Sequence, residues 1–311
     1  MNVIFMGTPD FAVPVLESII KSDNHKVVAV VTQPDRPVGR KAVITPPPVK
    51  VAAAAHGLPT FQFEKIRLEG AETLKSLNAD IMVTCAYGQL LSQEIIDICK
   101  FGIINVHASL LPKYRGAAPI QYAVINGESK TGVTFMKTAA GLDTGDIIAE
   151  YETAIDEDET AGELAARLSA LGAEHICDIL TAIENGSATF TPQNEQLAFT
   201  VKTIKKEQAE TDFSLPAVKV MQFILGMNPA PVAYAFCKDK KIKIYRAKAL
   251  NEEFAGKCGE VVKADKKLIV KCGSGAIEIT EIQEEGGKKL SARDFTAGRK
   301  LAVGDVLGKN L

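Results

Sequence analysis

The chain has 311 residues, of which 46% are hydrophobic and 24% charged, an ordinary composition for a globular protein whose length suggests two domains. No apolar run reaches the ~18 residues that span a bilayer, and the first twenty residues lack a signal-peptide pattern, so we expect a cytoplasmic protein with no membrane partner. The six cysteines are scattered singly, which argues against a zinc site and against a disulfide scaffold.

Charge is distributed unevenly along the chain. Residues 1–204 contain 16 Lys and Arg against 24 Asp and Glu, a net charge of −8, whereas residues 205–311 contain 20 against 14, a net charge of +6. A basic C-terminal region suggests a polyanionic partner. On composition alone, solvated lysines on a small domain explain the same numbers equally well.

The N-terminal half alternates strands and helices, as βαβ units do. Strands are expected at residues 2–6, 26–32, 58–61, 79–84, 102–104, 131–137 and 147–155. Helices are expected at residues 11–20, 49–55, 71–77, 93–99 and 117–126, followed by a long amphipathic helix from about residue 160. The turn after the first strand lacks GxGxxG, and no GxxxxGK[ST] occurs, so nucleotide binding of either usual type is poorly supported.

A proline- and glycine-rich stretch, residues 33–48, follows the second strand. It predicts a long surface loop that carries Arg36, Arg40 and Lys41 out of a largely acidic region. Such a loop suits phosphate binding, although an ordinary solvated insertion is the alternative.

Helical periodicity lapses around residues 189–206, where we place a linker. The expected domains are therefore residues 1–189 and 207–311, joined by a linker at 190–206. Beyond it, a helix near residues 215–225 precedes short alternating runs at 233–237, 241–247, 259–263, 268–272 and 276–283. That pattern is typical of a small β-barrel.

Polar side chains with a chemical role are expected where the strand that ends at Ile104 meets the sheet edge. Asn105 and His107 follow it, and residues two apart on an extended segment share a face, so an amide and an imidazole can point into one crevice. Asp143 lies between Gly141 and Gly145 on a loop that can approach a ligand closely, and its carboxylate can orient His107.

This set favours direct acyl transfer between two bound substrates. No GxSxG nucleophile motif and no metal-ligand cluster occurs in the sequence. Asn105 and His107 can donate hydrogen bonds to a developing oxyanion, and Asp143 can hold the imidazole and help to remove a proton from an attacking amine.

Four groups of residues together resemble the folate-dependent formyltransferase family: Asn105-Val106-His107, Ser109-Leu110-Leu111-Pro112, Arg115-Gly116 and Asp143. The resemblance implies a doubly wound, mostly parallel, Rossmann-like domain that binds 10-formyltetrahydrofolate as formyl donor without a metal. It implies that Asn105, His107 and Asp143 are catalytic. The folate contacts that it implies are Ser109, Leu110, Leu111 and Pro112, and Ala86, Tyr87, Gly88, Gln89, Leu90 and Leu91.

Further segments, residues 5–12, 32–40, 115–121 and 141–146, are similar to the branch of the family that formylates methionyl-tRNA. This similarity implies a monomer that acts in translation initiation, with an OB-like C-terminal barrel that binds initiator methionyl-tRNA. It also implies tRNA contacts by Arg36, Arg40 and Lys41, although the residues from Lys41 onward, and Ala230, depart from the pattern. The alternatives are a formyltransferase for glycinamide ribonucleotide or an amino-sugar nucleotide, and a non-catalytic RNA-binding protein.

Overall fold

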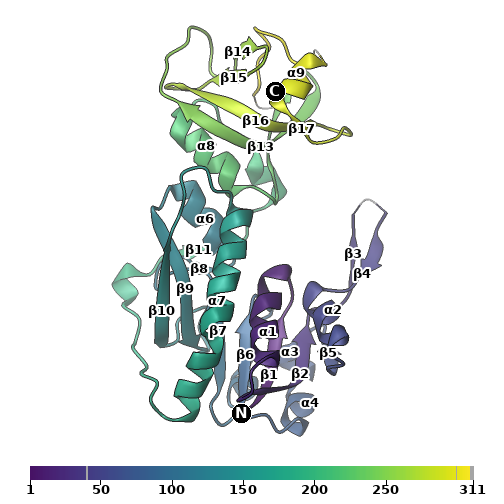
Figure 1. Cartoon of the computed structure of the whole chain (residues 1–311), viewed down its shortest axis with the longest axis vertical. Coiled ribbons are helices and arrows are strands. Elements are labelled where there is room, and N and C mark those ends of the chain that lie inside the picture. The colour runs from purple at the N-terminus through teal and green to yellow at the C-terminus, as the bar shows by residue number, and fades with distance from the viewer. Residues whose placement is uncertain (40, 299, 309–311) are drawn as a thin grey trace. The chain divides into compact units, whose positions relative to one another are not determined.

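The computed structural model describes residues 1–39, 41–298 and 300–308, and Figure 1 traces the whole chain. The chain divides into two compact units. Unit 1 consists of residues 1–116, 132–153 and 165–200, and unit 2 of residues 117–131, 154–164 and 201–311. Each unit is thus assembled from several segments of the chain. Each predicted domain, in contrast, is one continuous segment, which ends at residue 189 or begins after residue 206. The division of the chain into domains at residues 189 and 206 remains a prediction.

Unit 1 is built on a seven-stranded sheet. Five neighbouring strands are parallel, and β9 joins β7 antiparallel. Four of the parallel strands are almost entirely apolar and buried, as expected for a sheet covered on both faces. In order across the sheet the strands are β10 (Ile147–Ala154), β9 (Lys130–Lys137), β7 (Ile103–His107), β6 (Ile81–Cys85), β1 (Asn2–Gly7), β2 (Lys26–Thr32) and β5 (Thr60–Gln62).

The strand order reverses between β1 and β6. The chain runs from β1 through β2 to β5 on one side and returns to β6, β7 and β9 on the other. Gly7 pairs with Cys85 where both strands end, and the Thr8 hydroxyl donates to the Tyr87 carbonyl at 2.9 Å just beyond them. Ligands of open α/β sheets bind outside such a reversal, at the carboxyl ends of the strands.

Helices accompany this sheet, and their apolar positions explain why they form. Val15, Leu16 and Ile19 of α1 (Val13–Ile20) are fully buried, at helical spacing. The helix α7 (Ala161–Glu184) begins with a capping box, because the Thr160 hydroxyl accepts from the Glu163 N–H while the Glu163 carboxylate accepts from the Thr160 N–H. The other helices of unit 1 are η1 (Asp10–Ala12), α1 (Val13–Ile20), α2 (Pro48–Ala55), α3 (Ile66–Glu69), α4 (Ala71–Ser76), α5 (Gln93–Ile96) and η2 (Glu195–Leu197).

Two local expectations for unit 1 were wrong. Residues 33–48 contain a β-hairpin, β3 (Arg36–Val38) and β4 (Val43–Thr45), instead of an irregular loop, and Figure 1 shows it extending from the helices of its unit. The central strand also continues past Ile104 to His107, so Asn105 and His107 belong to the strand itself. Both errors concern chain pairing, which residue propensity does not reveal.

Unit 2 is an antiparallel sheet closed by the last described residues. Val306 bridges Glu260 beside β14 (Val261–Ala264), and Gly308 bridges Phe236 of β12 (Ala233–Cys237), so this segment joins the two edge strands. The predicted small β-barrel is confirmed, although β17 and α9 (Ala292–Ala297) were not expected. The strand order is β12 (Ala233–Cys237), β13 (Lys240–Leu250), β16 (Ala276–Glu284), β15 (Leu268–Lys271) and β14 (Val261–Ala264), with β17 (Leu290–Ser291) beside β16.

Helices cover the core of unit 2, and α9 contributes the buried Ala292 and Phe295 to it. The buried face of α8 (Ala217–Gly226) includes Ala217, Val220 and Ile224, at helical spacing. The helix α6 (Pro119–Asn126) packs against α8, and Gly226 makes this possible because a side chain there would collide with Ile125. The remaining short elements are β8 (Arg115–Gly116), β11 (Thr200–Val201) and η3 (Lys206–Ala209). None of the helices in the described ranges combines the length and apolar character needed to cross a membrane.

Candidate functional site

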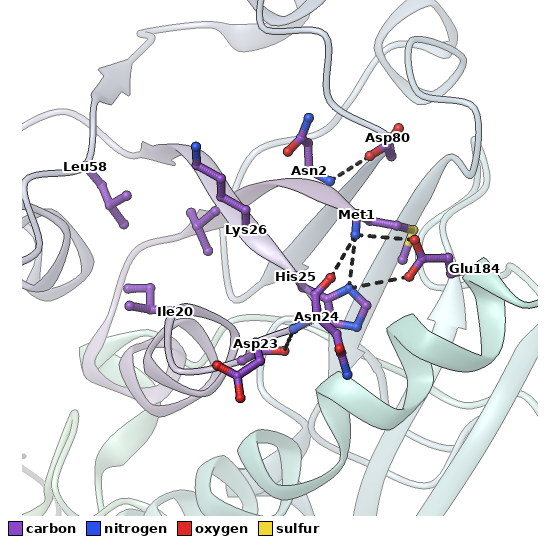
Figure 2. Close-up of a pocket in the computed structure, with 12 residues that line it drawn as sticks. Met1, Asn2, Ile20, Asp23, Asn24, His25, Lys26, Leu58, Asp80 and Glu184 are labelled. Carbon is purple, nitrogen blue, oxygen red and sulfur yellow. Dashed lines mark hydrogen bonds and ion pairs between the residues drawn. The ribbon is translucent and has the colours of Figure 1, made fainter.

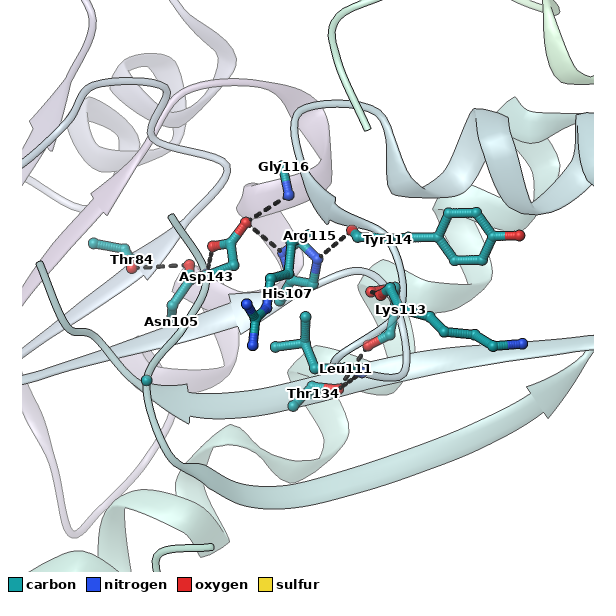
Figure 3. A network of polar contacts seen from close by, with 12 residues as sticks. Thr84, Asn105, His107, Leu111, Lys113, Tyr114, Arg115, Gly116, Thr134 and Asp143 are labelled. Atoms are coloured by element: carbon teal, nitrogen blue, oxygen red, sulfur yellow. Dashed lines mark hydrogen bonds and ion pairs between the residues drawn. The ribbon is translucent and has the colours of Figure 1, made fainter. Parts of the chain in front are cut away.

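The structure brings Asn105, His107 and Asp143 together at the carboxyl edge of the unit 1 sheet. Figure 3 shows the three side chains facing one another, the first two from β7 and the third from the loop that joins β9 to β10. The Asn105 Nδ2 atom lies 3.4 Å from Asp143 Oδ1, and His107 Nδ1 lies 3.7 Å from Asp143 Oδ2. An amide, an imidazole and a carboxylate therefore converge on one point.

The orientation of the Asn105 amide is fixed by its neighbour on β6. The Thr84 hydroxyl donates to Asn105 Oδ1 at 2.9 Å, so the oxygen is engaged on the side of β6. The Nδ2 group then faces Asp143 and the interior of the site (Figure 3). Asn105 is thus held as a hydrogen-bond donor toward the site.

The protonation of the His107 ring is constrained by the backbone. His107 Nε2 lies 3.0 Å from the Tyr114 carbonyl oxygen, and because a carbonyl only accepts, Nε2 carries a proton. The Nδ1 atom is the one directed at Asp143, as Figure 3 shows. Only 7% of the His107 side chain is exposed, so the two neighbours determine how the ring sits. Tyr114, and not Asp143, holds the tautomer.

Asp143 is held in an unusual backbone conformation. Its φ of 50° lies in the left-handed region, which Asp tolerates better than most residues. Its Oδ2 atom accepts the Gly116 N–H at 2.8 Å. Gly145, two residues on, must be glycine because a side chain would collide with the Lys137 carbonyl oxygen. The loop therefore lies close against the end of β9.

A second layer of side chains contacts the backbone of this loop. Gln193 Nε2 donates to the carbonyl oxygens of Asp143 and Gly145, at 2.8 Å each. Its Oε1 accepts from Arg115, whose guanidinium also forms two hydrogen bonds with the Glu195 carboxylate, at 2.7 and 2.9 Å. Gln193 lies in the predicted linker at 190–206.

The segment Ser109–Pro112 is partly interior. The Ser109 hydroxyl is buried and donates to the Lys113 carbonyl at 2.7 Å, and the buried Leu111 donates its N–H to Thr134 Oγ1 at 3.1 Å (Figure 3). Leu110 and Pro112 are only partly buried. Folate contact by the side chains of this segment would thus fall mainly to Leu110 and Pro112.

The loop after β6 alternates between exposed and interior residues. Ala86, Gly88 and Leu90 are exposed, and Leu91 packs against the core. The Tyr87 ring is buried in the same core, and the desolvation of its hydroxyl raises the pKa of Tyr87 well above its usual value. Gln89 accepts the Ile66 N–H at 2.9 Å and donates to the Phe63 carbonyl at 2.8 Å. A ligand at this loop would meet Ala86, Gly88 and Leu90 first.

Two of the basic residues expected to contact RNA, Arg36 and Lys41, lie on the β3–β4 hairpin and its turn. Arg36 is exposed and forms an ion pair with Glu64 at 2.6 Å. Lys41 is exposed, and Arg40 lies outside the described residues. Val38, Val43 and Ile44 are also exposed, at 57–62%.

A depression lies at the opposite edge of the sheet. It has a volume of about 780 Å³ and is lined by residues at the amino ends of β1 and β2, as Figure 2 shows. His25 is buried there, with Nε2 3.1 Å from Thr181 Oγ1 and Nδ1 3.4 Å from the Met1 ammonium. This is not the edge at which α/β sheets bind their ligands. In the described part of the chain, no three His, Cys, Asp or Glu side chains are arranged to hold a metal ion.

Comparison with known proteins identifies the family. The model of the formyl transferase family matches residues 1–180, and that of the formyl transferase C-terminal domain matches residues 203–300. Methionyl-tRNA formyltransferase of Citrifermentans bemidjiense is 45% identical over 99% of this chain and 97% of its own length, and that of Bacillus subtilis is 43% identical over 99% and 98%. The chain belongs to the methionyl-tRNA formyltransferase family. The family resemblance seen in the sequence is confirmed.

Solved structures outside the methionyl-tRNA formyltransferases share the fold. An N-formyltransferase from Helicobacter canadensis, in complex with folinic acid and dTDP-3-aminofucose, has a TM-score of 0.68 at 20% identity over 93% of this chain and 99% of its own. HypX from Aquifex aeolicus, in complex with tetrahydrofolic acid, has a TM-score of 0.66 at 16% identity over the whole chain. The chain spans about half the length of HypX, 48%. These likenesses establish the fold alone.

Several residues that shape the site were not anticipated. The Tyr114 carbonyl, the Thr84 hydroxyl and the Gly116 N–H each fix one member of the Asn105, His107 and Asp143 set. A strand neighbour such as Thr84 could be inferred only from the pairing of β6 with β7, in which Thr84 lies opposite Asn105. Gln193 is separated from Asp143 by 50 residues, and no local pattern connects them.

Proposed function

We propose that this protein transfers the formyl group of 10-formyltetrahydrofolate to the α-amino group of initiator methionyl-tRNA, by direct attack of the amine. The observation that carries this proposal is the convergence of Asn105, His107 and Asp143 at the carboxyl edge of the sheet in a chain at least 43% identical, over 99% of its length, to two methionyl-tRNA formyltransferases. Such a set can stabilise a tetrahedral intermediate without an acyl-enzyme.

Two donors face the point where the formyl oxygen gains negative charge. The first is Asn105 Nδ2, because the other side of the amide is occupied by Thr84. The second is Nδ1–H of His107 in its doubly protonated form, because the Nε2 proton is directed at the Tyr114 carbonyl. The Nδ1 to Asp143 separation of 3.7 Å exceeds a good hydrogen bond, so this proton remains available to substrate. Each such donor is worth ~3 kcal/mol in the transition state.

Asp143 supports the proton transfers. The amine attacks the formyl carbon, the bond from that carbon to N10 of the folate breaks, and one proton leaves the amine while one is delivered to N10. An α-amino group titrates near 8, so a neutral amine is accessible at pH 7. The Asp143 carboxylate accepts the amine proton, directly or through water.

The surrounding residues are assigned to the substrates in the same proposal. The segments that contain Leu110, Pro112, Ala86, Gly88 and Leu90 contact the folate, and Arg36 and Lys41 on the β3–β4 hairpin contact tRNA phosphates. Arg40 is assigned to the tRNA from the sequence alone. The basic C-terminal region adds favourable charge for a polyanion. The cytoplasmic location and the monomeric state stay predictions.

The decisive experiment compares two acceptors with 10-formyltetrahydrofolate as donor: initiator methionyl-tRNA and glycinamide ribonucleotide. Formylation of the tRNA alone is expected. Formylation of glycinamide ribonucleotide, or of an amino-sugar nucleotide added as a third substrate, would agree with the proposed chemistry but would contradict the proposed acceptor. Binding of the tRNA with no turnover of any acceptor would favour a non-catalytic RNA-binding protein.

A further inference from the structure

The loop that carries Asp143 is held from behind by a glutamine. Gln193 Nε2 donates to the carbonyl oxygens of Asp143 and Gly145, and Gln193 Oε1 accepts from Nε and Nη2 of Arg115 at 3.0 and 2.7 Å. A guanidinium group only donates, so the Arg115 contact fixes which end of the amide is oxygen. The nitrogen must then face the loop, and both of its protons are used.

Arg115 is itself held firmly. Only 5% of its side chain is exposed, and the Glu195 carboxylate accepts two of its N–H groups. The next residue, Gly116, donates its N–H to the Asp143 carboxylate at 2.8 Å. The backbone of Asp143 is therefore tied through Gln193 to Arg115, and its carboxylate is tied to the residue that follows Arg115. The segment Arg115–Gly116 therefore holds both the backbone and the carboxylate of Asp143.

This support matters because the Asp143 conformation is strained and its contacts are long. A non-glycine residue at a φ of 50° persists only when its surroundings determine it. The carboxylate lies 3.4 Å from Asn105 Nδ2 and 3.7 Å from His107 Nδ1, so a small shift of the loop changes both distances. A displacement of about 1 Å at a catalytic group can cost about 10²-fold in rate.

We infer that Gln193 is a positioning residue, which holds the Asp143 carboxylate opposite His107 Nδ1, and that Arg115 and Glu195 orient Gln193. This inference rests on the role proposed above for Asp143. Gln193 and Glu195, within the predicted linker at 190–206, then help to position the catalytic site. Their function is separate from joining two domains.

Gln193→Glu tests this inference with little change in shape. The glutamate still accepts from Arg115, but it directs a carboxylate oxygen, in place of two N–H donors, at the carbonyls of Asp143 and Gly145. We expect kcat to fall about 10²-fold, with small changes in KM for both substrates. Gln196→Glu makes the same chemical change on the exposed surface of the same segment, and it is expected to leave kcat unchanged.

A double-mutant cycle with Asp143→Asn separates positioning from general destabilisation. If Gln193 acts through Asp143, Gln193→Glu lowers kcat no further in the Asp143→Asn background. Additive losses, or wild-type kcat in Gln193→Glu beside an impaired Asp143→Asn, would overturn this inference and leave the proposed function standing. An unimpaired Asp143→Asn would instead overturn the proposed role of Asp143.

Glu195→Ala provides a second variant, at a side chain that is 69% exposed. It removes the carboxylate that fixes Arg115 and leaves Gln193 in place. We expect a several-fold fall in kcat with KM retained, and an unchanged kcat would exclude the part assigned to Arg115 and Glu195. Thermal unfolding and circular dichroism establish that each variant is folded.

Discussion

At the scale of single residues, the site depends on which ring nitrogen of His107 faces the substrate. The Tyr114 carbonyl holds one nitrogen protonated, so chemistry is confined to Nδ1. We predict that His107→Gln lowers kcat by about 10²–10⁴-fold with unfolding temperature retained, and that Asn105→Ala lowers it by about 10²–10³-fold. Single-turnover formylation of methionyl-tRNA measures both, and near-wild-type rates in either would contradict the mechanism.

His25 provides a prediction about stability and pH. Burial, followed by the adjacent Met1 ammonium, lowers the pKa of His25 from its ordinary 6.5 in the folded protein. As pH falls through 6.5 the unfolded chain binds a proton that the folded chain does not, so the free energy of unfolding decreases. His25→Gln cannot titrate. We therefore expect the stability advantage of the wild type over this variant to shrink between pH 8 and pH 5 in urea titrations. A wild-type advantage that grows toward low pH would mean that the pKa of His25 is raised in the folded protein.

The residue scale also marks the limit of what the sequence reveals about the site. Asn105, His107 and Asp143 could be proposed because each sits in a recognisable local setting, a strand end or a glycine-flanked loop, and the family motif contains them. Gln193 has no such setting. Its role depends on a contact with a loop 50 residues away, and a single sequence contains no trace of that contact.

At the scale of elements, the start of α7 offers a direct test of local stabilisation. The Thr160 hydroxyl accepts from the Glu163 N–H at 3.3 Å and donates to its carboxylate at 2.8 Å. We predict that Thr160→Ala lowers the free energy of unfolding by about 1 kcal/mol. Thr153→Ala, at a strand position outside the cap, serves as a comparison of the same chemical change. Equal effects of the two substitutions in urea would mean that the cap adds nothing.

Elements were predictable where the signal is local. Residues 26–32 and 233–237 were expected as strands and are β2 (Lys26–Thr32) and β12 (Ala233–Cys237), because their apolar runs end at turn residues. The β3–β4 hairpin was missed since Pro37 within a short exposed run argues against a strand. The closing segment Val306–Gly308 was missed because its partners, Glu260 and Phe236, are 46 or more residues away.

At the scale of the whole molecule, charge predicts how tRNA binding responds to salt. Binding through phosphates releases counterions, so log Kd for tRNA should rise linearly with log salt concentration. The Arg36–Glu64 ion pair is exposed and worth little, so Arg36 is free to exchange partners. We predict that Arg36→Ala weakens tRNA binding and reduces the slope by about 1, with folate binding unchanged.

Lys21→Ala is the matched control for this prediction. It also removes one positive charge from unit 1. Lys21 lies at the end of α1 and forms an ion pair with Glu17 of the same helix. Fluorescence titration with initiator methionyl-tRNA at several salt concentrations gives both slopes. An identical reduction for Lys21→Ala would mean that net charge, and not the hairpin, determines the salt dependence.

The segmental construction of the two units has a consequence for limited proteolysis. The chain passes between them five times, after residues 116, 131, 153, 164 and 200. A cut at the exposed Gly186–Ser187 bond would leave α6 in the first fragment and α8 in the second, yet these helices pack together in unit 2 around Gly226. We expect the nicked protein to elute from a sizing column as one species and to separate only in denaturant. The two halves of the polypeptide are then not two detachable modules, and a gene fragment that begins after the predicted linker would encode a barrel lacking one of its covering helices.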